Sequence, residues 1–198
     1  MGKVILTMKV GLFFGSFNPI HVGHMVIANH MLAFTDLDKI WFVVSPHNPL
    51  KQKQTLLHER QRLQMVTLAI GDNNKMKASN IEFKLPQPSY TINTLTYLKE
   101  KYPNNDFVLI MGSDNLDSFP KWKNYDEILK EYELYVYPRP GFKENKFSDH
   151  KKVKIINAPL MELSSTVIRN AVKEKKDIRY FLPSAVWEYL KEMHFYEK

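Results

Sequence analysis

The fold is decided by the stretch Gly15–His24, which reads GSFNPIHVGH. It follows the short apolar run Val10–Phe14 and precedes His21–Phe34, where apolar residues recur at helical spacing. These three segments predict a first buried strand, a tight loop and a helix. In an open α/β sheet such a junction lies beyond the carboxyl end of a strand, which is where ligands bind.

The rest of the chain repeats this alternation of strand-like and helix-like segments. Further strands are predicted at Ile40–Val44, Met76–Phe83, Phe107–Met111, Leu134–Tyr137 and Lys154–Ile156. Further helices are predicted at Leu57–Ile70, Thr91–Tyr102, Tyr125–Tyr132, Ser164–Lys175 and Ser184–Met193. We therefore expect an α/β fold with an open, mostly parallel sheet, helices on both faces and a C-terminal helical segment. Residues 1–198 are expected to form a single domain, with residues 1–8 as an N-terminal extension.

Composition narrows the class of protein. The chain has 198 residues, 44% of them hydrophobic and none of them cysteine. This balance is that of a globular protein with a real core, and no apolar run is long enough to cross a membrane. Without cysteine there is no disulfide, thiolate metal site or thiol nucleophile, which suits a cytoplasmic protein. The net charge of +7 favours an anionic partner, either a phosphate-rich small molecule or a nucleic acid.

Two histidines make the first loop a candidate site. His21 and His24 are three residues apart, so both project from one face of the first helical turn and can donate hydrogen bonds to phosphate oxygens. Gly15 is expected to allow an unusual turn or a close approach to a ligand, and Gly23 to leave room for a flat group between the imidazoles. The competing interpretation is a capping turn with packed histidines. A zinc site would need a third ligand at suitable spacing, and His30 fits surface or packing better.

Two other segments carry polar groups that could meet a nucleotide. Ser164–Thr166 precedes an apolar-periodic run, so it predicts a helix N-cap whose hydroxyls and free N–H groups can bind phosphate, with Arg169 one turn further on. The simpler alternative is a plain cap with a surface arginine. Gly112 and Asp114 follow the clearest strand, where a carboxylate can accept from ribose hydroxyls or help hold hydrated Mg²⁺; a capping aspartate is the alternative.

The first loop resembles the signature of the HxGH nucleotidyltransferase superfamily. From Val10 to about Tyr189 the chain resembles the bacterial nicotinate-nucleotide adenylyltransferases of that superfamily. The resemblance implies a Rossmann-like fold. It also implies an enzyme of NAD biosynthesis that joins ATP and nicotinate mononucleotide, with Mg²⁺, into nicotinate adenine dinucleotide and pyrophosphate. His21 and His24 are then the catalytic residues. The implied ATP-binding residues are Gly15, Ser16, Phe17, His21, His24, Gly112, Asp114, Ser165, Thr166 and Arg169.

The same resemblance implies a mononucleotide site. Trp122 would stack on the nicotinate ring, and the segment of Tyr90 and Thr91 would offer backbone donors to the nicotinate carboxylate. Asn18 and Lys51 complete the implied set. The chain departs from the family pattern at two positions. Similar sequences often have an aromatic residue where this chain has Lys123, and a histidine where it has Leu50.

Three other functions compete with this interpretation. One is a relative in the same superfamily that uses another acceptor, such as phosphopantetheine, and a second is preference for nicotinamide mononucleotide. The third is a basic nucleic-acid-binding module, but the lysines are scattered rather than arranged in a stripe with aromatic residues. We therefore expect small-molecule substrates and neither a nucleic acid nor a membrane as partner; assembly of identical copies is compatible with the sequence.

Overall fold

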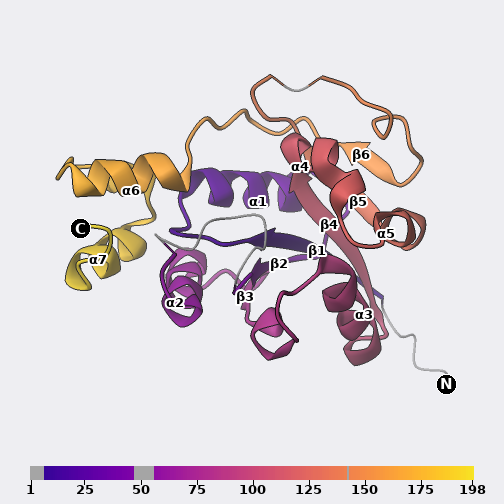
Figure 1. The fold of residues 1–198 in the computed structure, drawn as a ribbon, viewed down its shortest axis with the longest axis horizontal. Coiled ribbons are helices and arrows are strands. Elements are labelled where there is room, and N and C mark those ends of the chain that lie inside the picture. Colours follow the sequence, from indigo (N-terminus) through magenta and orange to yellow (C-terminus); the bar gives the residue numbers. More distant parts are fainter. Residues whose placement is uncertain (1–6, 47–55, 142) are drawn as a thin grey trace.

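A six-stranded parallel sheet forms the centre of the protein (Figure 1). The computed structural model describes residues 7–46, 56–141 and 143–198. The strands are β1 (Met8–Gly15), β2 (Lys39–Val44), β3 (Met76–Ser79), β4 (Asn105–Gly112), β5 (Glu133–Tyr137) and β6 (Val153–Ile155). Their order is β3-β2-β1-β4-β5-β6, and every neighbouring pair is parallel. The expected Rossmann-like sheet is confirmed.

Helices cover both faces of this sheet, as the alternation in the sequence predicts. They are α1 (Val22–Phe34), α2 (Glu59–Ile70), α3 (Thr91–Lys101), α4 (Ser113–Ser118), α5 (Tyr125–Glu131), α6 (Ser165–Lys173) and α7 (Ser184–Glu192). Figure 1 shows α1 and α3 on opposite sides of the strands. None of the helices in the described residues has the length and apolar composition needed to cross a membrane.

Two apolar cores, one on each side of the sheet, hold the layers together. Phe13 of β1 packs with residues of α1, α2, α6 and α7, whereas Val10 and Leu12 pack with residues of α3, α4 and α5. Because successive side chains of a strand point to opposite faces, one apolar strand can contribute to both cores. This explains why the buried strands read as continuous apolar runs.

Three details differ from the sequence expectation. The strand expected at Met76–Phe83 ends at Ser79, and Ile81–Lys84 is a 3₁₀ turn in which the carboxylate of Glu82 is buried against Thr94 and Ser89. A buried carboxylate needs hydrogen-bond partners, and the chain turns out of the sheet where Glu82 reaches Thr94 and Ser89. The helix α4 directly after β4 was not predicted, because its six residues are too few to show a period. Met8 belongs to β1, where it pairs with Asn105, rather than to an extension.

The strand order reverses between β1 and β4. Since β2 and β3 lie on one side and β5 and β6 on the other, the chain leaves β1 and β4 in opposite directions. A crevice opens at such a switch point, beyond the carboxyl ends of the strands. Gly15 and Gly112, the last residues of the two strands, lie at this crevice.

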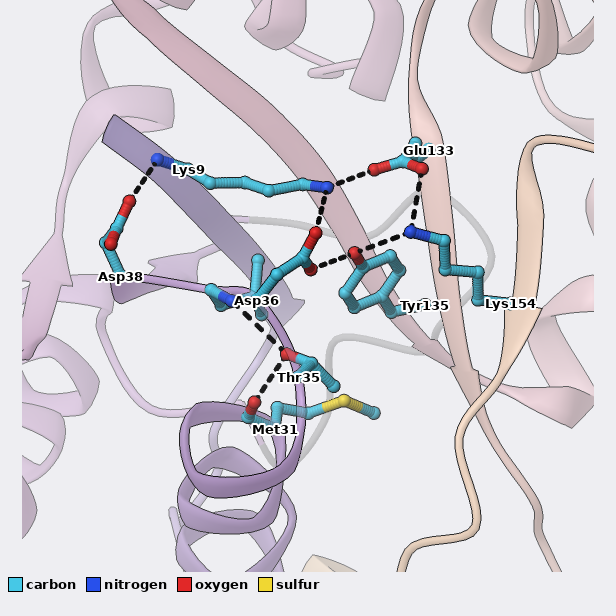
Figure 2. Close-up of polar contacts among 9 residues, drawn as sticks. Lys9, Met31, Thr35, Asp36, Asp38, Glu133, Tyr135 and Lys154 are labelled. Atoms are coloured by element: carbon cyan, nitrogen blue, oxygen red, sulfur yellow. Dashed lines mark hydrogen bonds and ion pairs between the residues drawn. The ribbon is translucent and has the colours of Figure 1, made fainter. Parts of the chain in front are cut away.

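A charged network lies at the opposite, amino edge of the sheet (Figure 2). The ammonium group of Lys9 donates to Asp36 at 2.8 Å and also to Glu133. The hydroxyl of Tyr135 donates to Asp36, and Lys154 lies 3.1 Å from that hydroxyl and 3.0 Å from Glu133. Although partial burial opposes it, hydrogen bonding to Lys9 and Tyr135 lowers the pKa of Asp36 to about 2. The network joins the starts of β1 and β5 to the segment after α1.

Candidate active site

A cavity of about 570 Å³ opens at the carboxyl ends of β1 and β4. Its size is that of a small-molecule site. All but one of the residues predicted for the site line this single cavity; the exception, Lys51, lies outside the described residues. The lining members of the predicted set are Gly15, Ser16, Phe17, Asn18, His21, His24, Tyr90, Thr91, Gly112, Asp114, Trp122, Ser165, Thr166 and Arg169.

The two histidines stack on each other at the start of α1. Their ring centroids are 3.8 Å apart, with an angle of 36° between the planes. His21 is the N-cap residue of the helix, and its backbone N–H donates to Nδ1 of His24 at 3.3 Å. The pair is therefore fixed by the helix itself, with both rings at the cavity wall.

His21 is the more enclosed of the two rings. The residue is only 4% exposed, and its Nδ1 atom is buried beside Gly23. Burial, together with the nearby charge of Arg139, lowers the pKa of His21 to about 4. His21 is thus neutral at pH 7, so one ring nitrogen carries a proton and the other can accept a hydrogen bond.

The two glycines of the loop serve a purpose other than the one expected. A Cβ atom on Gly23 would lie 3.0 Å from Nδ1 of His21, so this glycine makes room for the His21 ring itself. Because the imidazoles stack directly, no flat group fits between them. A Cβ on Gly15 would lie 2.8 Å from the ring of Phe17. Each glycine therefore makes room for a neighbouring side chain, and neither has a positive φ, so the expected unusual turn does not occur at Gly15.

The unusual turn in this loop falls on Phe17. Its φ of 44° lies in the left-handed region. The residue is 2% exposed, and its ring packs against those of Phe13, Phe42 and His24. A non-glycine residue held in this region costs about 1–3 kcal/mol, which the surrounding structure must offset. Burial of the ring is one source of that stabilisation.

Arg62 of α2 is a second source, and sequence reasoning missed it. Its side chain is completely buried, and within the described part of the chain its guanidinium donates to four backbone carbonyls. The acceptors are Ser16 (2.5 Å), Leu57 (2.8 Å), Ser45 (2.8 Å) and Pro46 (2.9 Å). A planar fork of five N–H groups suits this arrangement, since its donors point in fixed, divergent directions. Arg62 therefore ties the loops after β1 and β2 to the start of α2.

The start of α6 lies against the same loop. Ser164 is the N-cap, accepting from the N–H of Val167 at 3.3 Å, as predicted. Ser165 donates to the carbonyl of Pro19 at 2.9 Å. Arg169 donates to the carbonyl of Asn18 at 2.9 Å and to the hydroxyl of Thr166 at 3.2 Å. The two predicted phosphate-binding segments, about 145 residues apart, thus form one continuous polar wall.

Asn18 and Asp114 have protein partners of their own. The side-chain Oδ1 of Asn18 accepts from the N–H of Leu57 at 3.2 Å and from the hydroxyl of Tyr196 at 2.7 Å. Asp114 lies 3.7 Å from Arg139, which follows β5 and was missed in the sequence. The rule that identified Gly112 applies equally to Arg139, because β5 is the parallel neighbour of β4 and its carboxyl end meets the same edge.

The other end of the cavity is more aromatic. Trp122 packs edge-on against Phe119, with 5.5 Å between ring centroids, and Tyr90 caps α3 ahead of Thr91. Lys123, the departure from the family pattern, places its ammonium 4.6 Å from the centre of the Tyr90 ring. This cation–π contact occupies one side of Tyr90 and brings positive charge to the cavity.

Comparisons with known proteins agree with this geometry. Residues 12–171 match the family model described as cytidylyltransferase-like. The "probable nicotinate-nucleotide adenylyltransferase" of Flavobacterium johnsoniae is 59% identical over 193 residues, covering 96% of this chain and 100% of that protein. The protein of the same name from Bacteroides thetaiotaomicron is 46% identical, covering 93% of this chain and 92% of that protein. The solved Plasmodium falciparum nicotinic acid mononucleotide adenylyltransferase complexed with NaAD has a TM-score of 0.81 at 20% identity, covering 96% of this chain and 98% of that one, which establishes the shared fold.

Proposed function

This chain belongs to the nicotinate-nucleotide adenylyltransferases within the cytidylyltransferase-like family, and on that basis we propose how its cavity performs adenylyl transfer. ATP and nicotinate mononucleotide are converted to nicotinate adenine dinucleotide and pyrophosphate. One observation carries the proposal: two stacked imidazoles line a cavity of about 570 Å³ at the switch point of the sheet.

The reaction needs no nucleophile from the protein. A phosphate oxygen of the mononucleotide attacks the α-phosphorus of ATP in line, forming a new P–O bond while the bond to the bridging oxygen of the leaving pyrophosphate breaks. The attacking oxygen is already an anion, so no proton has to be removed first. Catalysis then consists of positioning the reactants and stabilising the charge that develops on the phosphate oxygens.

His21 and His24 are proposed to supply that stabilisation. A neutral imidazole donates from one nitrogen and accepts at the other, so neutral His21 gives one N–H to a phosphate oxygen. His24 lies on the first turn of α1, where the helix N-terminus also favours negative charge, and we assign it to the α-phosphate. Both groups are in place before the substrate arrives, which is what makes such donors effective.

Ser165, Thr166 and Arg169 are proposed to hold the outgoing pyrophosphate. They stand at the start of α6, and Arg169 already bridges Thr166 and the carbonyl of Asn18. A phosphate arriving there would meet hydroxyls, helix N–H groups and a guanidinium together. Trp122, Tyr90 and Thr91 at the aromatic end are the proposed mononucleotide contacts.

Mg²⁺ is proposed to enter bound to the phosphates of ATP. The described residues contain no group of three carboxylates or histidines able to hold a metal ion, and the cavity's Asp114 is paired with Arg139. This donor set suits a hydrated ion that keeps its waters and touches one carboxylate at most. When bound, the metal neutralises charge on the phosphates. We also propose that the enzyme acts in the cytoplasm.

The substrate is tested by following pyrophosphate release with ATP and Mg²⁺. Parallel reactions contain nicotinate mononucleotide, nicotinamide mononucleotide or phosphopantetheine. Release with nicotinate mononucleotide is expected. Release only with another acceptor would keep the phosphate chemistry and refute the assignment of Trp122, Tyr90 and Thr91.

The role of His24 is tested by His24→Ala. We expect kcat to fall about 100- to 1,000-fold, as on removal of one transition-state donor, with little change in ATP affinity. His30→Ala is the matched control, since His30 lies on the same helix and stacks on the exposed ring of Phe34. Equal losses of kcat and ATP affinity in His24→Ala would contradict a role confined to the transition state.

A further inference from the structure

The conformation of residues 16–19 depends on side chains from distant parts of the chain. Phe17 adopts a left-handed φ, so the loop requires restraints from outside itself. Arg62 holds the carbonyl of Ser16, and Arg169 holds that of Asn18. These restraints act on the backbone at two points, and a further group holds the side chain of Asn18.

That group is Tyr196, in the C-terminal segment. Its hydroxyl donates to Oδ1 of Asn18 at 2.7 Å across 178 residues of sequence. The same oxygen accepts from the N–H of Leu57, so two donors fix the side-chain amide between the C-terminal segment and the start of α2. Burial raises the pKa of Tyr196, although the charges of Arg169 and Arg62 oppose that shift, so the phenol is enclosed among the groups that hold the loop.

The segment that carries Tyr196 is itself anchored. Phe195 is 6% exposed, and its N–H donates to the carbonyl of Leu190 in α7 at 3.1 Å. The ring of Phe195 packs against those of Tyr189 and Tyr196. The hydroxyl of Tyr196 is therefore presented to Asn18 from a fixed position rather than from a free end.

We propose that Tyr196 is a positioning residue for adenylyl transfer, because its hydroxyl holds Asn18 and with it the loop from which His21 and His24 project. The inference rests on the proposed function. Tyr196 acts through its hydrogen bond to Asn18. His21 follows the loop by two residues, so a shift of Asn18 displaces the stacked imidazoles relative to the reacting phosphates.

The first test is Tyr196→Phe, which removes one hydroxyl and keeps the packed ring. We expect kcat to fall about tenfold, less than the roughly 100-fold cost of a full 1 Å misplacement, while KM for both substrates stays within about twofold. Tyr189→Phe is the matched control, because it removes a hydroxyl from a ring packed against Phe195 and should leave kcat unchanged. The double variant with Asn18→Ala should be no slower than Asn18→Ala alone.

The second test does not depend on activity. NMR titration of the imidazole signals should show the pKa of His21 rising from about 4 towards 6.5 in Tyr196→Phe, since a loosened loop admits water. Thermal unfolding measures the folded fraction of the wild type and of Tyr196→Phe. The proposal is overturned if Tyr196→Phe has a kcat within about twofold of wild type, or if its loss of kcat matches its loss of folded protein. It is also overturned if the effects of Tyr196→Phe and Asn18→Ala on kcat are additive, or if the titration of His21 is unchanged in Tyr196→Phe. A wild-type protein inactive on nicotinate mononucleotide would refute the proposed function instead, and the titration would still decide whether Tyr196 holds the loop.

Discussion

The buried imidazole of His21 makes the stability of the protein sensitive to mild acid. Its pKa is lowered from 6.5 to about 4 by burial and by Arg139. The folded state therefore binds fewer protons than the unfolded state below pH 6.5, and stability falls as the pH falls from there towards 4. A pKa shift of this size contributes roughly 3 kcal/mol to the free energy of unfolding. About 2 kcal/mol of that contribution is lost between pH 7 and pH 5.

The assay is urea unfolding of the wild type and of His21→Asn, followed by tryptophan fluorescence at pH 8, 7 and 5. Measurements at pH 8 give the cost of the substitution itself, because an unperturbed histidine is then neutral in both states. Between pH 7 and 5 the wild type should lose about 2 kcal/mol more than the variant. Titrating carboxylates affect both proteins, so they cancel in this difference. An equal loss in the two proteins would show that His21 takes up a proton as easily in the folded state, and the argument from burial would fail.

Arg62→Lys should destabilise the protein by about 3 kcal/mol or more. A single ammonium cannot reach four divergent carbonyls, and each hydrogen bond from a charged donor contributes roughly 1.5–3 kcal/mol. The urea midpoint measures this, and a midpoint equal to that of wild type would contradict it. Asp36→Asn at the amino edge should cost less than about 1 kcal/mol, because its side chain is 58% exposed and screened by solvent. Its lowered pKa means that this contribution is present above about pH 4 and disappears towards pH 2, so the difference from wild type should shrink at pH 3 and in high salt. A difference independent of both pH and salt would rule out an electrostatic origin.

Much of the fold could be predicted because local pattern and tertiary position agree. The apolar runs in β1 and β4 are buried on both faces, and such continuous apolar runs predict central parallel strands. The carboxyl-edge rule predicted that the His21 loop and Asp114 lie at the same edge of the sheet, whereas the start of α6 was predicted as a helix N-cap and was linked to them only by the family resemblance. The strand prediction failed only after Ser79, where a buried carboxylate rather than hydrophobic alternation determines the path of the chain.

The groups that shape the site were harder to find. Arg62, Arg139 and Tyr196 have no motif, and each acts through a partner distant in sequence. An arginine within an amphipathic pattern is normally read as a solvated charge, whereas Arg62 lies on the buried face of α2. Gly15 and Gly23 stand out in the sequence, but the space beside them is occupied by the side chains of Phe17 and His21, which the sequence did not predict.

The contact between Asn18 and Tyr196 has a consequence for the newly made chain. The loop that carries the histidines is synthesised well before the hydroxyl that holds it, which follows 178 residues later. At about 5–20 residues per second, roughly 9–36 s separate the two during translation. Throughout that interval the sheet can form around β1, but the loop is without one of its restraints. The loop therefore gains the hydrogen bond from Tyr196 only after helices α6 and α7 have been synthesised.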